Sequence, residues 1–234
     1  MIYNAVITGA SRGIGYAVAK RFAEAKFSLF LVSRNVVDLE NARRDLLQAG
    51  ATSVYIYSAD LSDESQTQLA IEAIKTQFSY ITVLVNSTGI FMPGTMMEES
   101  NMQFYQLWNT NVSSAYWVSK GLWPVLKVSS RAHVFTMCSV ASVMAYSAGG
   151  TYSLSKFALL GFSKSLRLEG MPHGIAVSAV ILGATYTDSW AGINLPESRF
   201  MKSSDIATAI FSAFEINESA VMEEVLIRPL LGDI

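Results

Sequence analysis

A glycine-rich turn near the start of the chain limits the folds that this sequence can adopt. Gly9, Gly13 and Gly15 lie between an apolar run at residues 2–7 and a segment whose apolar residues recur at helical spacing. Glycines between a strand and a helix permit a tight turn and let the backbone approach a pyrophosphate at the positive helix end. The turn predicts a dinucleotide site, with a purely connecting glycine turn as the alternative until a second motif is found.

Strand-length apolar runs alternate with helical patterns along the rest of the chain. The predicted strands cover residues 2–8, 29–33, 53–57, 81–85, 132–137, 176–181 and 225–227. The predicted helices cover residues 14–25, 36–49, 63–78, 102–128, 152–170 and 204–214. Such alternation favours a parallel sheet covered on both faces. We therefore predict an α/β protein with a single Rossmann-fold domain over residues 1–234 and a doubly wound, seven-stranded parallel sheet.

The composition fits a large buried core and argues against nucleic-acid binding. Of the 234 residues, 51% are hydrophobic and 15% are charged, which predicts a globular chain with further burial between subunits. The formal net charge is −2, and no local run forms a basic stripe. We therefore expect no nucleic-acid partner.

The apolar content does not indicate a membrane protein. Mean hydropathy is +0.31, but the most apolar tract, residues 175–184, is much shorter than the span of about 20 residues that a bilayer requires. The first residues lack a charged leader and a cleavage site, so we expect no secretory signal. Cys138 is the single cysteine, which excludes an intrachain disulfide and predicts a cytoplasmic protein.

Three long connections each follow a predicted strand. They span residues 87–101, 138–151 and 183–202. Long loops in compact domains are usually functional, and ligands bind at the carboxyl edge of a parallel sheet. We expect these loops to meet at the cofactor edge, with residues 183–202 as the substrate loop.

The residues after the second strand indicate which cofactor binds. An acidic residue there would bind a ribose 2′-hydroxyl and repel a 2′-phosphate. This chain has Ser33 and then Arg34, and a second arginine, Arg12, precedes the first helix. A cation is unfavourable at a helix N-terminus unless an anion offsets it, so the two arginines predict NADP(H). Two solvated surface cations are the alternative.

Four polar residues form a candidate catalytic set. Tyr152 and Lys156 lie one turn apart on one helix face. A free phenol has a pKa of about 10, and a close ammonium lowers it toward the range useful for a general acid. Ser139, just beyond the fifth strand, can donate to a substrate carbonyl, and Asn111 lies in the long fourth helix. Taken singly, they have ordinary alternatives: a surface pair, a loop hydroxyl and a polar residue in a helix bend.

The glycine turn and these four residues, in this order and spacing, resemble the short-chain dehydrogenase/reductase family over residues 2–232. The resemblance implies an NADP-dependent oxidoreductase that transfers the pro-S hydride of NADPH to a carbonyl carbon while Tyr152 protonates the oxygen. It implies that Lys156 also holds the nicotinamide ribose and that the Asn111 backbone binds a water that resupplies the proton. It further implies homodimers or homotetramers formed through the helices beginning near Met102 and Tyr152.

The same resemblance assigns further cofactor positions. Asp60 matches the contact to the adenine amino group, with a turn or helix-start carboxylate as the alternative, and Thr187 matches the carboxamide contact. The turns at Ser87, Thr88 and Leu182 depart from the family patterns Asn-Asn-Ala-Gly and Pro-Gly-x-Val-x-Thr. The hydrogen bonding of the first turn and the path of Leu182 therefore stay open. The full cofactor set is Gly9, Ser11, Arg12, Gly13, Ile14, Gly15, Ser33, Arg34, Asp60, Leu61, Asn86, Gly89, Tyr152, Lys156, Gly183, Thr185 and Thr187.

The substrate is predicted from the loop after Thr187. Residues 183–190 and 223–233 are similar to those of bacterial sepiapterin reductases, which implies reduction of pterin side-chain ketones. Trp190 is a candidate stacking partner for a flat heterocycle, with ordinary packing as an equal alternative. Asp233 is a candidate for the amino-pyrimidine, with a surface tail as the alternative. The predicted substrate residues are Ser139, Tyr152 and Trp190, with apolar walls from Phe91, Met92, Met96 and Met97.

Two other functions stay open. A 3-oxoacyl-[acyl-carrier-protein] reductase, or another small-ketone reductase, uses the same catalytic set, although an acidic carrier favours a basic patch that is not obvious here. A non-catalytic nucleotide-binding protein is more remote because Ser139, Tyr152 and Lys156 are all present.

His133 and His173 have no ligand partners at metal spacing, so we expect no metal. Glu98 and Glu99 are interpreted as solvated charges or element ends.

Overall fold

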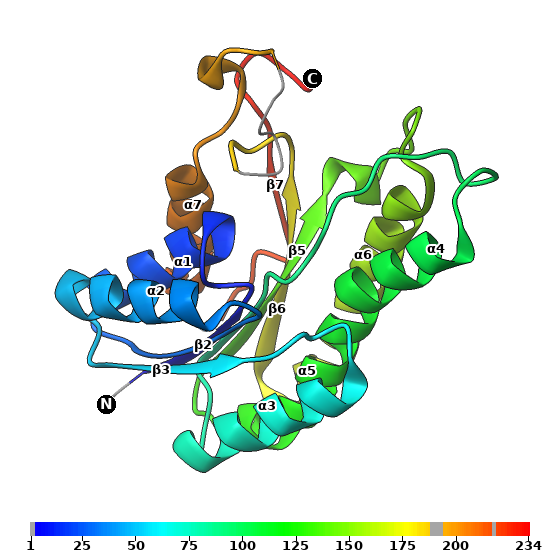
Figure 1. Cartoon of the computed structure of the whole chain (residues 1–234). Coiled ribbons are helices and arrows are strands. Elements are labelled where there is room, and N and C mark those ends of the chain that lie inside the picture. The colour runs from blue at the N-terminus through cyan, green and yellow to red at the C-terminus, as the bar shows by residue number, and fades with distance from the viewer. Residues whose placement is uncertain (1–2, 188–193, 217–218) are drawn as a thin grey trace.

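The computed structural model describes residues 3–187, 194–216 and 219–234 of the chain (Figure 1). Its sheet has the strand order β3-β2-β1-β4-β5-β6-β7, and the neighbouring strands are parallel. The strands are β1 (Asn4–Thr8), β2 (Ser28–Ser33), β3 (Ser53–Ser58), β4 (Val83–Asn86), β5 (Ala132–Ser139), β6 (Ile175–Leu182) and β7 (Glu224–Ile227). The predicted seven-stranded parallel sheet of a Rossmann fold is therefore confirmed.

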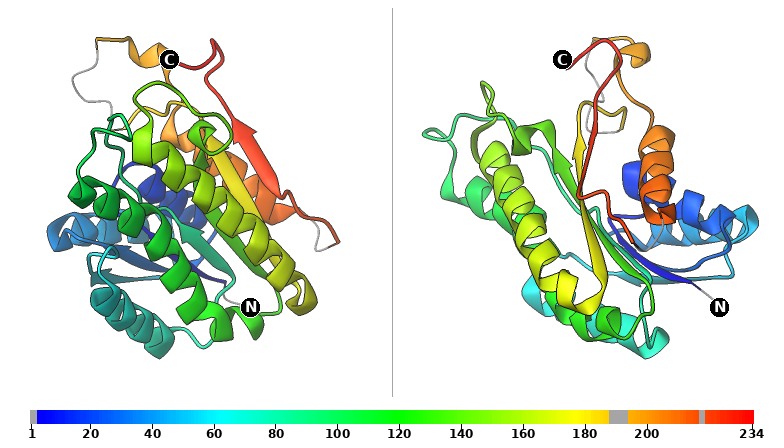
Figure 2. Two further views of the ribbon diagram at one scale, coloured as in Figure 1. Left: turned by 90° about the vertical axis from the view of Figure 1, so that its right-hand side faces the viewer. Right: turned by 180° about the vertical axis from the view of Figure 1, so that it is seen from behind.

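Helices cover both faces of the sheet (Figure 2). On one face lie α1 (Gly13–Glu24), α2 (Val36–Ala49) and α7 (Ser203–Glu215). On the other lie α3 (Glu64–Gln77), α4 (Asn101–Trp108), α5 (Ser114–Lys127) and α6 (Gly150–Gly170). Successive strand residues point to opposite faces. In β1, Ala5 and Ile7 accordingly join the first apolar cluster and Val6 joins the second.

The prediction of one continuous helix over residues 102–128 is wrong, because the helix is interrupted. The structure divides it into α4, a π-helical turn η1 (Asn109–Ser113) and α5. A π turn adds a residue to the helical ladder and is frequent at functional sites. The apolar periodicity did not reveal it because α4 and α5 each keep the helical spacing on either side of the insertion.

The loops that follow β4, β5 and β6 rise from one edge of the sheet, at the top of Figure 1. Two of them are joined directly, since the Gly94 amide donates to the Ala148 carbonyl at 3.0 Å. Ser139 is the last residue of β5 rather than the first after it, so its backbone is fixed by the sheet. This carboxyl edge is where the predicted catalytic residues are positioned.

One of the two histidines is buried in the sheet. His133 lies inside β5, where burial lowers its pKa to about 3 and its Nε2 lies 2.7 Å from the Ser178 hydroxyl. It is therefore a neutral residue of the core. Among the helices that the structure describes, none is long and apolar enough to cross a membrane.

Candidate active site

The glycine turn joins β1 to α1 in a shape that suits a phosphate. Gly9 and Gly13 have φ values of 63° and 60°, which favour glycine. A Cβ on Gly15 would overlap the Gly9 carbonyl oxygen, so only glycine lets α1 pack this closely. The Arg12 side chain does not cap α1, and the first amides of a helix have no intrahelical acceptors. The turn therefore presents N–H groups and a positive helix end.

Polar side chains surround the end of β2. The Ser33 and Ser11 hydroxyl oxygens lie 2.9 Å apart and link β2 to the glycine turn. Arg12 and Arg34, the neighbours of these serines in the chain, are exposed. We call these four residues the serine–arginine corner. It is the site predicted for the 2′-phosphate of NADP(H).

Asp60 follows β3 and is held in a turn. Its Oδ1 accepts hydrogen bonds from the Ser62 amide at 3.0 Å and from the Ser62 hydroxyl at 2.8 Å. The next residue, Leu61, is buried. Asp60 Oδ1 thus has the turn role given as the alternative, and the adenine contact of Asp60 stays a prediction.

The turn after β4 is held by backbone amides. Thr8 Oγ1 accepts from the Ser87 amide at 3.0 Å and from the Thr88 amide at 3.1 Å. The two side chains that depart from the family pattern are therefore not needed for these bonds. Asn86 is buried and donates to the Ser119 hydroxyl at 2.9 Å, so its side chain points toward α5 rather than toward the cofactor edge.

The structure brings Ser139, Tyr152 and Lys156 together at the carboxyl edge. The Ser139 hydroxyl lies beside the Tyr152 phenol, where it favours the ionised form of that phenol and so acts to lower its pKa. Lys156 is buried, its Nζ lies 5.8 Å from the centroid of the Tyr152 ring, and this ammonium donates to the Met137 carbonyl at 2.9 Å. The Phe91 ring meets the Tyr152 ring edge-on, with 4.9 Å between centroids. Phe91, which belongs to the loop after β4, therefore forms one wall of the site beside the Tyr152 phenol.

Burial controls how this cluster titrates. It raises the pKa of Tyr152, although the adjacent Ser139 hydroxyl opposes the shift, and it lowers the pKa of Lys156. The sequence predicts a lowered pKa for Tyr152, whereas in this structure the pKa is raised, because desolvation by burial is the largest effect on the phenol. Burial also raises the pKa of the Cys138 thiol to about 11, so the thiol stays neutral.

Asn111 lies in the π turn η1 and joins two parts of the site. Its Oδ1 accepts from the Ile90 amide at 2.8 Å, and its Nδ2 donates to the Ile90 carbonyl at 3.1 Å and to the Ser155 hydroxyl at 3.0 Å. Ser155 in turn donates to the Tyr152 carbonyl at 2.7 Å. The sequence analysis missed Ser155, for which the one signal is its place beside Lys156. Gly89 lies close by, since a Cβ there would be 3.4 Å from Asn111 Oδ1.

The segment after β6 crosses the glycine turn. Leu182 continues the strand, and the Gly183 amide donates to the Ile227 carbonyl at 2.9 Å. Thr185 is buried, and the Thr187 methyl group lies 3.6 Å from where a Cβ on Gly13 would be. The path of Leu182, which the sequence left open, is therefore that of the last residue of β6, paired with Ile227 of β7. Trp190, the predicted stacking residue, lies outside the described residues.

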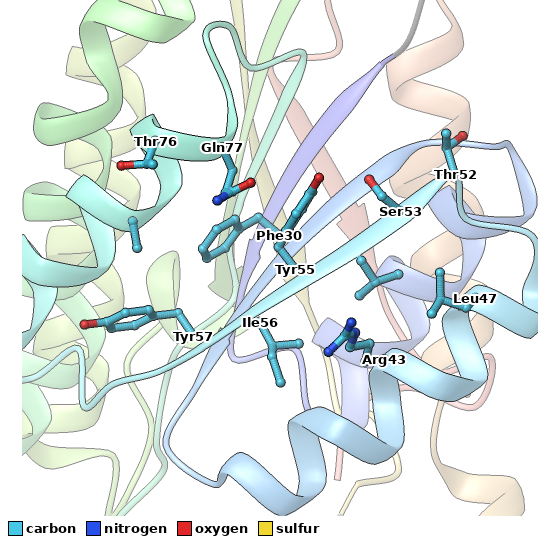
Figure 3. Close-up of a pocket in the computed structure, with 12 residues that line it drawn as sticks. Phe30, Arg43, Leu47, Thr52, Ser53, Tyr55, Ile56, Tyr57, Thr76 and Gln77 are labelled. Atoms are coloured by element: carbon cyan, nitrogen blue, oxygen red, sulfur yellow. The ribbon is translucent and has the colours of Figure 1, made fainter.

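A groove of about 620 Å³ lies away from this edge, along the outer strand β3 (Figure 3). Aromatic side chains line it, among them Phe30, Tyr55 and Tyr57. Arg43 is the one charged residue among the described residues that line it. The groove contains none of the predicted catalytic groups.

The described residues also contain no cluster of three or more His, Cys, Asp or Glu side chains that could hold a metal ion.

The parallel sheet, the glycine turn and the Ser-Tyr-Lys cluster at the carboxyl edge are the architecture of a dinucleotide-dependent oxidoreductase. A sequence model of the family described as "short chain dehydrogenase" matches residues 3–198. The chain belongs to this family.

Individual relatives resemble the chain over most of its length. It is 30% identical to a sepiapterin reductase of Chlorobaculum tepidum, over 98% of this chain and 97% of that protein. It is 29% identical to the 3-oxoacyl-[acyl-carrier-protein] reductase of Escherichia coli, over 88% of this chain and 87% of that one. A crystal structure of a metagenomic short-chain oxidoreductase in complex with NADP superposes with a TM-score of 0.85 at 25% identity, covering 97% of this chain and 96% of that one.

Proposed function

We propose that this protein is an NADPH-dependent carbonyl reductase with Asn111, Ser139, Tyr152 and Lys156 as its catalytic residues. The observation that carries the proposal is the meeting of the Ser139 hydroxyl, the Tyr152 phenol and the buried Lys156 ammonium at the cofactor edge. The NADP complex of the metagenomic relative supports the choice of cofactor.

The residues present fit NADP(H). Gly9 and Gly13 give the turn that we assign to the pyrophosphate a backbone shape that favours glycine, and the serine–arginine corner offers two cations for a 2′-phosphate. Because the Asn86 side chain points toward α5, we assign its cofactor contact to the backbone. The remaining proposed contacts follow the strands at the same edge or lie in α1 and α6: Gly9, Gly13, Ile14, Asp60, Leu61, Gly89, Tyr152, Lys156, Gly183, Thr185 and Thr187.

The proposed mechanism assigns one task to each catalytic residue. Bound NADPH supplies the hydride. The Ser139 hydroxyl holds the substrate carbonyl oxygen by a hydrogen bond, and the Tyr152 phenol gives that oxygen its proton. Burial raises the pKa of Tyr152, which keeps the phenol protonated at neutral pH. Lys156 holds the ribose hydroxyls, and the Asn111 backbone holds a water that resupplies the proton.

For the substrate we propose a pterin with a side-chain ketone. The sepiapterin reductase relative supports this choice, as do the similar tracts at residues 183–190 and 223–233. The C-terminal segment folds back onto the cofactor edge, since a Cβ on Gly183 would lie 3.1 Å from Asp233 Oδ1 and 2.8 Å from Pro229 Cδ. Arg228 pairs with Asp233 at 3.3 Å. This carboxylate is a candidate acceptor for the amino-pyrimidine.

A substrate panel tests the proposal. NADPH oxidation is measured with sepiapterin, an acetoacetyl thioester and diacetyl. We expect kcat/KM for sepiapterin to exceed the other two by at least about 100-fold, because polar groups built for a heterocycle stay unpaired with a small ketone. A preference for the thioester would instead support 3-oxoacyl-[acyl-carrier-protein] reduction as the function, which is the activity named for the Escherichia coli relative at 29% identity. No turnover of any ketone would support a non-catalytic nucleotide-binding protein.

We also propose a homodimer or homotetramer formed through α4 and α6. Large apolar side chains on these helices are exposed, including Met102 at 77%, Tyr105 at 60% and Phe157 at 44%. Burying them between subunits would remove apolar surface from water. Sedimentation of the protein at the mass of a dimer or tetramer is the expected result, and a monomer at micromolar concentration contradicts it.

A further inference from the structure

The helix that carries Tyr152 begins without a cap of its own. Gly149 stands at the N-cap position of α6 and has no side chain to accept from the first amides. Gly150 follows it, and glycine is among the weakest helix formers. Tyr152 lies in this first turn, so the position of the phenol depends on whether the turn stays formed. The first amides must therefore find acceptors elsewhere.

Glu99 supplies that acceptor from a distant part of the chain. The Thr151 amide donates to both carboxylate oxygens of Glu99, at 3.2 Å to Oε1 and 3.1 Å to Oε2. A carboxylate at a helix N-terminus also interacts favourably with the helix dipole. Glu99 is partly buried, and a Cβ on Gly150 would overlap its Oε1. The weak helix former at position 150 therefore makes room for the carboxylate.

A second bond joins the same two segments. The Gly94 amide donates to the Ala148 carbonyl at 3.0 Å. The loop after β4 thus contacts the start of α6 on both sides of the glycine pair. That loop also provides Phe91, whose ring packs against Tyr152. Glu99 therefore links the loop that carries Phe91 to the helix turn that carries Tyr152, the residue that we assign as the general acid.

We propose that Glu99 is a positioning residue that holds the first turn of α6, and with it the Tyr152 phenol, in the geometry for proton transfer. The inference rests on the proposed role of Tyr152. It also goes beyond the interpretation of Glu99 as a solvated charge or an element end, because its carboxylate accepts from the Thr151 amide. Glu98 differs from its neighbour, because it accepts from the Thr95 hydroxyl at 2.6 Å within its own turn and is exposed.

The test compares Glu99→Ala, Glu99→Gln and the matched control Glu98→Ala in the full-length protein. For Glu99→Ala we expect kcat for ketone reduction to fall by roughly 30-fold with KM for NADPH within about twofold, since a small misplacement of a reacting group is costly. Glu99→Gln keeps one acceptor oxygen and is expected to recover most of kcat. Glu98→Ala removes the same charge and is expected to leave kcat unchanged.

Hydrogen exchange gives a readout that does not depend on activity. We expect amides of residues 150–153 to exchange at least about tenfold faster in Glu99→Ala than in the parent or in Glu98→Ala, with exchange elsewhere unchanged. Unchanged exchange at residues 150–153 overturns the proposal, as does equal loss of kcat in the Glu98 and Glu99 variants. If Tyr152→Phe keeps full activity while exchange rises as expected, the capping contact stands and the proposed function is the part that fails.

Discussion

Replacing Tyr152 by phenylalanine is expected to lower kcat for ketone reduction by about a thousandfold, within the range that general acid catalysis contributes. The change removes the hydroxyl that lies beside Ser139 and leaves the ring. The edge-on contact with Phe91, at 4.9 Å between centroids, does not use that hydroxyl. Melting temperature and NADPH affinity should therefore change little. Single-turnover rates at saturating NADPH measure the loss directly.

Tyr146→Phe is the matched control for this experiment. Tyr146 lies close enough for the two phenols to interact electrostatically, and burial raises its pKa to about 12. Its hydroxyl has no assigned role in the reaction. Full activity in Tyr146→Phe together with a large loss in Tyr152→Phe attributes the proton to one phenol. Intact turnover in Tyr152→Phe removes the basis of the proposed mechanism.

The pH dependence follows from the direction of the Tyr152 shift. Burial raises the pKa of this phenol above its ordinary value. Reduction needs the protonated phenol, which is present below the pKa and lost as pH rises through it. We therefore expect the reduction rate to stay level through neutral pH and to fall only above about pH 10. Alcohol oxidation needs the phenolate and should rise over the same range, and both dependences should disappear in Tyr152→Phe.

The fold could be predicted because its signals are local. Apolar runs and helical spacing mark each strand and helix, and the glycine turn marks how β1 meets α1. The π turn η1 was not predictable in this way, because one inserted residue leaves the spacing of α4 and α5 intact. Its consequence is functional, since Asn111 lies within it and bonds with both Ile90 and Ser155.

The properties that sequence could not predict come from contacts between distant segments. Spacing places Tyr152 and Lys156 on one helix face, but the direction of the Tyr152 pKa shift depends on burial by surrounding elements. The contact between Glu99 and Thr151 joins residues 52 positions apart and has no local pattern. The sequence does place glycines at positions 149 and 150, at the start of a helix. Such a start needs hydrogen-bond acceptors from elsewhere, but it does not indicate which residue supplies them.

The double variant Ser33→Asp, Arg34→Ala is expected to weaken NADPH binding by about 100-fold and to make NADH the better cofactor. Ser33 ends β2, and its hydroxyl lies 2.9 Å from that of Ser11, so a carboxylate there enters the serine–arginine corner. It would accept from a ribose 2′-hydroxyl and repel a 2′-phosphate, while the loss of Arg34 removes a charge-assisted hydrogen bond. A 100-fold change corresponds to about 2.7 kcal/mol.

Arg43→Ala separates a local effect from a change of net charge. Arg43 lies in the next helix, where it is 3.6 Å from Glu40 and lines the groove along β3 (Figure 3). Its loss changes the charge of the chain by one unit but removes nothing from the serine–arginine corner. We expect NADPH and NADH dissociation constants, measured by fluorescence titration, to stay at parent values in Arg43→Ala. If NADPH binds the double variant as tightly as it binds the parent, the 2′-phosphate is held elsewhere and the assignment of Arg12 and Arg34 is wrong.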